Sequence, residues 1–274
     1  MLKLMYITNR PEIAQIAEAA GVDRIFVDLE YIGKAERQGG MDTVQSHHTL
    51  DDVKSIAKTL HLAELLVRVN PIHDETDEYG SSEAEIDGAI ANGADIIMLP
   101  YFKKVCEVEQ FLKFVDGRAK TMLLLETSEA VDIIDDVLEI KGIDMIHIGL
   151  NDLSLEYGMK FMFELLTNGT VERLCNKFLD KGMTYGFGGI ASLNKGMIPA
   201  EMIIREHYRL GSTCAILSRS FCNTDKIHDL DIIDSIFTNG VREIRALEKE
   251  CEEHTNYFKD NRCKLVQAVN KVVG

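Results

Sequence analysis

Residues 120–138 read KTMLLLETSEAVDIIDDVL and contain the two patterns that decide the fold. Residues 120–127 form a nearly continuous apolar run that ends in a carboxylate, which is typical of a strand buried on both faces. From Ser128, a plausible N-cap, apolar residues recur at helical spacing and predict a helix over residues 128–140. The apolar stripe of that helix consists of Ala130, Val131, Ile133, Ile134, Val137 and Leu138. This stretch therefore predicts one buried strand followed by one amphipathic helix.

The strand-then-helix pattern repeats along the whole chain, and no proline- or serine-rich linker interrupts it. The predicted strands are residues 2–8, 24–30, 64–70, 95–100, 120–127, 145–150, 184–189 and 213–219. The predicted helices are residues 11–20, 50–60, 83–92, 103–115, 128–140, part of 161–181, 200–210, and a long stretch within 230–272. Eight buried strands with crossover helices predict an α/β fold, a (β/α)8 TIM barrel over residues 1–274, with residues 230–274 as a C-terminal helical extension.

An open, doubly wound parallel sheet is the alternative fold. Such a sheet usually places a glycine-rich turn after its first strand, where the turn binds a nucleotide. Residues 8–11 read TNRP at this point and contain no glycine. The sequence therefore favours the barrel.

Composition and charge exclude several classes of partner. The 274 residues include 45 acidic and 30 basic side chains, which gives a formal charge of −15. Nucleic acids and anionic membranes bind basic surfaces, so neither is expected as a partner. No apolar run approaches the ~20 residues that span a bilayer, and the first residues lack a signal-peptide core. We expect a soluble, cytoplasmic protein whose six cysteines, which lack metal-site spacing, are reduced.

Five charged residues stand at the ends of four apolar runs, at the carboxyl ends of strands where barrels carry their active sites. They are Asp28, Glu30, Arg68, Glu126 and Asp152. By period-two alternation, Asp28 and Glu30 share one face, which is the barrel mouth if that face points inward. Glu126 and Asp152 follow neighbouring strands about 4.8 Å apart, so both can bind one ion, and two carboxylates suit Mg²⁺ or Mn²⁺. Without a cation the pair needs a basic partner such as Arg68; with one, Arg68 would stabilise a substrate oxyanion.

The segment after the second strand is long for a loop in a compact barrel, which is typical of functional loops. Residues 31–49 read YIGKAERQGGMDTVQSHHT. His47 or His48 could reach the barrel mouth and act as a base near neutral pH. Alternatively, both histidines lie on the surface and Thr49 caps a helix that begins at Leu50. Lys34 and Arg37 lie in the same segment, where both could be solvated.

Glycines and an arginine follow the seventh and eighth strands, where many barrels bind phosphate. The stretches are YGFGGIA (residues 185–191) and LSRSF (residues 217–221). A phosphate or second carboxylate could be held by Gly186, Gly188, Gly189, Arg219 and Ser220. Alternatively, the glycines only permit a tight turn, and Arg219 pairs with Glu30 or another acid. His147, within an apolar run, is expected to be a buried core residue.

Five segments, in order, resemble the HpcH/HpaI aldolase and citrate lyase β-subunit family. They are AGVDRIFVDLE (20–30), LLVRVNP (65–71), NGADIIMLP (92–100), LLLETSEAV (123–131) and GIDMIHIGLNDLS (142–154). The resemblance implies a (β/α)8 barrel that makes or breaks a carbon–carbon bond to a pyruvate-like enolate. It also implies that Glu126 and Asp152 are metal ligands and that Arg68 contacts the keto or enolate oxygen. The stretch from Gly149 to Asp152 would let the backbone approach the substrate.

Two positions depart from the aldolase branch of that family. Tyr31 stands where the branch has a histidine base, and Ala91 stands where it has the aspartate that supports the histidine. The general base therefore has to be another group. Glu30, acting through a metal-bound water, and His48 are the candidates.

The sequence thus predicts a Mg²⁺- or Mn²⁺-dependent lyase of the aldolase type that acts on a 2-oxo acid and an aldehyde, which could be phosphorylated. An acyl-CoA lyase of the citramalyl or malyl type is one alternative. A non-catalytic barrel that serves as a binding or assembly subunit is another, because Tyr31 and Ala91 replace catalytic groups. Helices beyond the eighth barrel unit pack onto neighbouring subunits in the related family, so the resemblance also implies a homo-oligomer.

Overall fold

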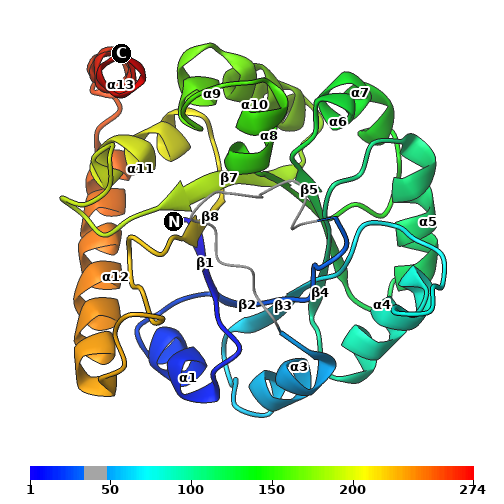
Figure 1. Cartoon of the computed structure of the whole chain (residues 1–274). Helices are drawn as coiled ribbons and strands as arrows, with labels where there is room; N and C mark the ends of the chain where they lie inside the picture. The colour runs from blue at the N-terminus through cyan, green and yellow to red at the C-terminus, as the bar shows by residue number, and fades with distance from the viewer. Residues whose placement is uncertain (34–47) are drawn as a thin grey trace.

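A computed structural model describes residues 1–33 and 48–274 and contains a closed barrel of eight parallel strands (Figure 1). Each strand pairs with its neighbours in chain order, and β8 closes the barrel against β1. The strands are β1 (Lys3–Ile7), β2 (Arg24–Asp28), β3 (Glu64–Arg68), β4 (Ile96–Leu99), β5 (Lys120–Leu125), β6 (Met145–Ile148), β7 (Thr184–Ile190) and β8 (Cys214–Leu217). The predicted TIM barrel is confirmed, and most strands end one or two residues earlier than predicted.

Helices surround the barrel and cover its outer face (Figure 1). They are α1 (Pro11–Ala19), α3 (Leu50–Ala57), α4 (Ser82–Ala91), α5 (Val105–Val115), α6 (Ser128–Asp132), α7 (Ile134–Val137), α8 (Leu150–Glu156), α9 (Glu164–Thr167), α10 (Thr170–Asp180), α11 (Ala200–Arg209), α12 (Leu230–Glu253) and α13 (Phe258–Val273). The long C-terminal helical segment is present as α12 and α13. Helix α12 packs on α1 and α11, and α13 packs on α11 and α9.

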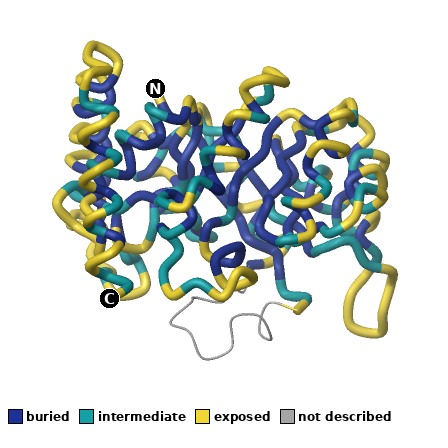
Figure 2. The backbone as a smooth tube through the Cα atoms, turned by 90° about the horizontal axis from the view of Figure 1, so that it is seen from above, coloured by how far each residue is buried: buried dark blue, intermediate teal, exposed yellow. Residues whose placement is uncertain are grey.

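Alternate side chains of each strand divide the core into two layers. Inward-facing side chains fill the barrel with a small cluster that contains Met5, Phe26, Leu66, Ile96, Met98, Met122, Leu124, Met145 and Cys214. Outward-facing side chains pack against the helices in a larger cluster. Figure 2 is turned by 90° from Figure 1, so that the barrel is seen across its axis. Buried strands cross the centre of this view, and exposed positions lie on the outer helices and at both ends of the barrel. No helix among the described residues is long and apolar enough to cross a membrane.

The unit at residues 120–138 differs from its prediction at the start and the middle of the helix. Thr127, not Ser128, is the N-cap, because its hydroxyl accepts a hydrogen bond from the backbone N–H of Ala130. The predicted single helix is divided into α6 and α7 at Ile133. Thr127 is fully buried, and its hydroxyl also donates to the carbonyl of Phe102 in the loop between β4 and α5. This second contact explains why Thr127 and not Ser128 is the cap.

His147 is a buried core residue, as predicted. Its Nε2 atom donates to the carbonyl oxygen of Gly188 at 3.2 Å, and its Nδ1 atom lies 3.8 Å from the Cys214 sulfur. Burial lowers the pKa of His147 to about 4, so the ring is neutral near pH 7. This histidine therefore links β6 to β7 and β8 inside the barrel.

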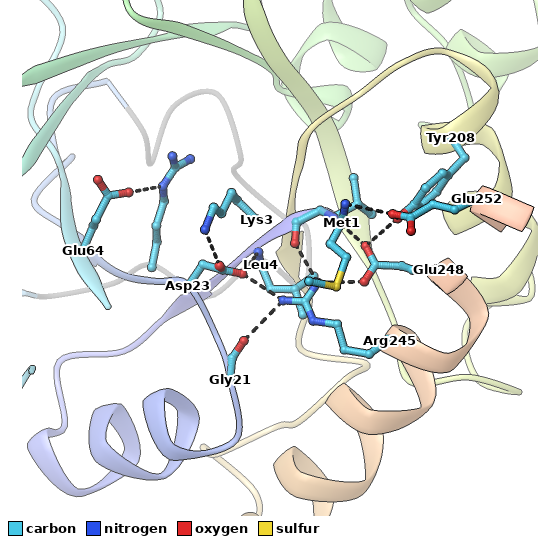
Figure 3. A network of polar contacts seen from close by, with 12 residues as sticks. Met1, Lys3, Leu4, Gly21, Asp23, Glu64, Tyr208, Arg245, Glu248 and Glu252 are labelled. Carbon is cyan, nitrogen blue, oxygen red and sulfur yellow. Dashed lines mark hydrogen bonds and ion pairs between the residues drawn. The ribbon is translucent and has the colours of Figure 1, made fainter. Parts of the chain in front are cut away.

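Helix α12 fixes the first strand through a network of polar contacts at the amino-terminal end of the barrel (Figure 3). The guanidinium of Arg245 donates to the Leu2 carbonyl at 2.8 Å, to Glu248 Oε2 at 2.7 Å and to Asp23 Oδ2 at 2.9 Å. Glu248 is fully buried and its Oε1 accepts the backbone N–H of Leu2. The C-terminal extension therefore holds the start of β1 and the turn before β2.

Replacing Arg245 with methionine removes these bonds and leaves the Glu248 carboxylate buried without its cation. Because an unpaired buried charge is costly, Arg245→Met should lower the free energy of unfolding by about 2–3 kcal/mol in urea denaturation at pH 7. Arg242→Met is the matched control, because Arg242 is exposed on the same helix and should change stability by less than about 0.5 kcal/mol. Equal, small losses in both variants would contradict a structural role for Arg245.

Candidate active site

The guanidinium of Arg68 lies at the carboxyl end of β3 and binds two acids from the neighbouring strand end. Its Nε and Nη2 atoms donate to the two carboxylate oxygens of Asp28, each at 2.8 Å. Its Nη1 atom lies 3.3 Å from Glu30 Oε2. The strand register places Asp28 opposite Arg68, and the guanidinium lies 5.5 Å from the centre of the Phe26 ring inside the barrel. The prediction that Asp28 and Glu30 share the inward face agrees with these contacts.

Nearby carboxylates raise the pKa of Arg68. Burial disfavours the charged guanidinium, but the negative charges of Asp28 and Glu30 outweigh the effect of burial, and Glu126 contributes a further attraction. The pKa of Arg68 therefore lies well above its usual value. Asp28 and Glu30 are each 1% exposed. Three carboxylates among the described residues therefore act on this one guanidinium.

Glu126 directly follows β5, and the backbone around it fixes its carboxylate. Its Oε1 atom accepts the backbone N–H of Tyr101 at 3.1 Å, and the residue is 3% exposed. A Cβ atom on Gly149 would lie 2.8 Å from Glu126 Cβ and 2.9 Å from Glu126 Oε2. Gly149 is therefore required so that the Glu126 carboxylate can occupy its position, a role that differs from the predicted approach of this backbone to substrate.

Asp152 lies on the first turn of α8, which begins one residue after Gly149. The strand predicted over residues 145–150 ends at Ile148, so Asp152 belongs to a helix and not to a strand end. Its side chain is buried, and its Oδ1 atom accepts a hydrogen bond from the Asn151 side chain at 3.2 Å. Within residues 1–33 and 48–274, no group of three or more His, Cys, Asp or Glu side chains forms a ligand set. Metal ligation by Glu126 and Asp152 stays a prediction.

His48 is buried and anchors the end of β2. Its Nδ1 atom accepts the backbone N–H of Asp28 at 3.0 Å, and its carbonyl oxygen accepts the hydroxyl of Tyr31. The expected surface position for His48 is therefore wrong, whereas the expected helix cap at Thr49 is confirmed by a capping box with Asp52. Because Nδ1 is an acceptor, the neutral ring carries its proton on Nε2 and can donate but not accept there. Lys34, Glu36, Arg37 and His47 lie outside the described residues.

Two residues that were not predicted, Asn70 and Glu85, hold the segment after Glu30. The Oδ1 atom of Asn70 accepts the backbone N–H groups of Tyr31 and Ile32 at 2.7 and 2.9 Å. The Nδ2 atom of Asn70 donates to Glu85 at 2.8 Å, and its backbone N–H donates to the same carboxylate. Asn70 follows β3 and could have been found as a polar strand-end residue. Glu85, an acid in the first turn of α4, carries no comparable signal.

Burial and the nearby Glu30 carboxylate raise the pKa of Glu85 to about 6, although hydrogen bonds from Asn70 and the positive charge of His73 oppose the shift. Glu85, Asn70, Tyr31 and His48 line a cavity of about 410 Å³ between α3 and α4. A carboxyl group with a raised pKa beside a cavity is typical of functional regions.

The glycines after β7 have different roles. Gly186 lies opposite Cys214 in the barrel wall, where a Cβ atom would lie 2.2 Å from the Cys214 carbonyl oxygen. Gly186 therefore permits close strand packing and does not hold an anion at the rim, in contrast to the sequence-based expectation. Gly188 has a φ of +51° and packs against Leu150. Gly189, Arg219 and Ser220 line one cavity, so the structure brings these three candidates together.

The raised pKa of Glu85 predicts a pH-dependent effect on stability. A carboxyl group whose pKa is raised from 4.5 to about 6 on folding stabilises the fold below pH 4.5, and this contribution is lost as the pH rises through 6. Between pH 4.5 and 7, the free energy of unfolding of the wild type should therefore fall by up to about 2 kcal/mol relative to that of Glu85→Gln. Denaturant unfolding at several pH values measures it. Glu83→Gln, exposed on the same helix, is the control; a pH-independent difference for Glu85→Gln would refute the effect.

Comparisons with known proteins support one family. The model of the HpcH/HpaI aldolase/citrate lyase family matches residues 3–164, more than half of the chain. An HpcH/HpaI aldolase from Desulfitobacterium hafniense DCB-2 is 17% identical with a TM-score of 0.60, over 89% of this chain and 93% of that chain. An HpcH/HpaI aldolase/citrate lyase family protein from Burkholderia cenocepacia J2315 is 14% identical with a TM-score of 0.63, over 85% of this chain and 94% of that chain.

These two structural similarities show the fold, while the family match carries the assignment. A comparison with curated proteins found no match. The name of the family indicates, at a coarse level, an enzyme of the lyase or aldolase type. The resemblance found in the sequence is confirmed: the chain belongs to the HpcH/HpaI aldolase/citrate lyase family.

Proposed function

We propose that this protein is a divalent-metal-dependent carbon–carbon lyase that forms or cleaves a bond between a pyruvate-like 2-oxo acid and an aldehyde. The observation that carries the proposal is the placement of Glu126, whose carboxylate occupies space left by Gly149 and acts electrostatically on Arg68. A carboxylate fixed in this way at the carboxyl end of a barrel strand is available for chemistry. Membership of an aldolase and lyase family supports this class of reaction.

Glu126 and Asp152 would hold Mg²⁺ or Mn²⁺. Both provide carboxylate oxygens, which hard divalent cations prefer. When bound, the ion would act as a Lewis acid that draws electron density from the keto oxygen of the substrate.

Arg68 would stabilise the negative charge on that oxygen in the enolate, which arises when the carbon–carbon bond breaks or when pyruvate loses a methyl proton. Asp28 holds Nε and Nη2, so the plane of the guanidinium is fixed before the substrate binds. The side chain is only 13% exposed, and charges in a site that excludes water interact strongly. Its fixed geometry therefore favours the charged transition state over the neutral ground state.

Glu30 would hold and transfer the proton that the reaction moves between substrate and protein. It is buried next to Arg68, and its backbone N–H donates to Asp28 Oδ1, which fixes the residue. His48 was the other candidate, but its Nδ1 atom is engaged by the backbone of Asp28. We therefore assign His48 to anchoring the end of β2 and Glu30 to proton transfer.

The proposal predicts that the wild-type protein binds Mn²⁺ and exchanges the methyl protons of pyruvate for deuterium in D₂O. Glu126→Gln and Asp152→Asn should each weaken Mn²⁺ binding at least tenfold in isothermal titration and abolish the exchange seen by NMR. Glu129→Gln is the matched control, because Glu129 is an exposed acid near Glu126 that pairs with Lys103. It should leave both measurements unchanged.

Three results would contradict this function in different ways. Absence of both Mn²⁺ binding and proton exchange in the wild type would remove the metal-dependent lyase. Metal binding with no turnover on 2-oxo acids and aldehydes would instead support a non-catalytic barrel. Binding of coenzyme A would favour the acyl-CoA lyase.

Arg68→Lys tests the arginine separately. Lysine keeps the positive charge but cannot donate two parallel hydrogen bonds to Asp28, so the charge is no longer fixed. Loss of one preorganised donor typically lowers turnover by about 10²–10³-fold. We expect kcat for aldol cleavage to fall by this factor while Mn²⁺ affinity changes less than threefold. An unchanged kcat would exclude Arg68 from the charge-stabilising role.

A further inference from the structure

Tyr101, which lies two residues after β4, has an unusual backbone conformation. Three residues other than glycine have a positive φ in the described part of the chain: Tyr101 at +49°, Asp116 at +49° and Asn194 at +60°. Asp116 is the C-cap of α5, and aspartate and asparagine adopt left-handed conformations more readily than most residues. Tyr101 is an aromatic residue at the carboxyl end of a barrel strand. Its left-handed conformation is therefore strained and has to be maintained by its contacts.

Contacts with the segment after β5 hold Tyr101 and the residues that follow it. The backbone N–H of Tyr101 donates to Glu126 Oε1 at 3.1 Å. The carbonyl oxygen of the buried Phe102 accepts the Thr127 hydroxyl at 2.8 Å. The ammonium group of Lys103 lies 4.8 Å from the centre of the Tyr101 ring. These contacts restrain the loop between β4 and α5 and supply the support that a strained residue needs.

The Tyr101 N–H determines how the Glu126 carboxylate is oriented. Tyr101 binds Oε1, while Oε2 lies beside Gly149, where a Cβ atom would approach it to 2.9 Å. Gly149 directly precedes α8, and Asp152 lies on the first turn of that helix. The hydrogen bond from Tyr101 therefore directs the second carboxylate oxygen towards the segment that carries Asp152.

The side chain of Tyr101 contacts the same helix. Its hydroxyl donates to Glu156 Oε1 at 2.9 Å, and Glu156 is the last residue of α8. Residues four apart lie on one face of a helix, so Glu156 lies one turn beyond Asp152 on that face. Tyr101 thus contacts Glu126 through its backbone and the helix of Asp152 through its side chain.

We propose that Tyr101 is a positioning residue, whose left-handed backbone orients the Glu126 carboxylate towards the segment that carries Asp152. This inference rests on the proposed lyase function, in which these two carboxylates hold the metal ion. Tyr101 acts through Glu126 and not on the reacting atoms. Hydrogen-bond partners of metal ligands commonly affect metal affinity in this way, because a ligand that is already oriented loses less freedom when the ion binds.

Two substitutions separate the backbone of Tyr101 from its side chain. Tyr101→Asn and Tyr101→Val both remove the ring and the hydroxyl, but asparagine adopts a positive φ readily, whereas β-branched valine strongly disfavours it. We expect Tyr101→Val to bind Mn²⁺ about tenfold more weakly than Tyr101→Asn in isothermal titration. Thermal unfolding checks that both variants are folded. Asn194→Val is the control, because it introduces the same strain in the loop between β7 and α11 and should leave Mn²⁺ affinity unchanged.

NMR measures the contact without a metal ion. The chain has eight tyrosines, so protein labelled with ¹⁵N-tyrosine gives eight amide signals, and Tyr101→Phe identifies the Tyr101 signal by its loss. A hydrogen bond to a carboxylate is stronger than one to a neutral amide. Glu126→Gln should therefore shift the Tyr101 amide proton upfield, by more than any other tyrosine amide. Glu83→Gln, which changes an exposed acid on α4, should leave this signal unchanged.

The results distinguish this inference from the lyase proposal. The wild type could bind Mn²⁺ while Tyr101→Val and Tyr101→Asn bind it equally well, or the Tyr101 signal could be insensitive to Glu126→Gln. Either result would overturn Tyr101 as a positioning residue and leave the lyase proposal intact. If the wild type binds no Mn²⁺, the lyase proposal fails, and the Tyr101 amide signal alone decides whether this residue orients Glu126.

Discussion

The buried ion pair between Arg68 and Asp28 is the interaction on which the candidate site depends. It joins β3 to β2 across a residue pair fixed by strand register, and both side chains are almost inaccessible to water. Neither charge can be buried alone without a large cost, so each fixes the other. Asp28 also accepts the backbone N–H of Glu30 and donates its own N–H to His48. Two strand ends and His48, which lies two residues before α3, therefore meet at one ion pair.

A second set of contacts supports the first. Asn70 holds the backbone after Glu30 and is itself bound by Glu85 on α4, so the helix layer outside the barrel restrains the site within it. Glycines, which have no side chain, are as important for the site as these polar residues. Gly149 leaves the volume that Glu126 occupies, and Gly188 allows Leu150 to approach β7. A rigid site needs this support, because a displacement of about 1 Å is enough to impair catalysis.

The barrel and its charged strand ends could be predicted because they depend on local patterns. Apolar runs, helical stripes and the position of acids after strands are all visible in the sequence. The partner of Arg68 was not predictable, because it depends on how β2 and β3 align. Thr127 replaced Ser128 as a cap for a similar reason, since its hydroxyl also binds a loop distant in sequence. Glu85 looked like an ordinary first-turn acid, and only folding places it beside Asn70.

The net charge of the whole chain repels an anionic substrate, whereas the candidate site has to attract it. A formal charge of −15 repels anions at long range, but at physiological ionic strength this repulsion is screened beyond about 8 Å. Attraction therefore has to come from groups at short range, which on the proposed function are a cation held by Glu126 and Asp152 and the guanidinium of Arg68. The substrate would then be recognised only close to these two groups, so its binding depends on the geometry of the carboxyl end of the barrel and not on the net charge of the chain.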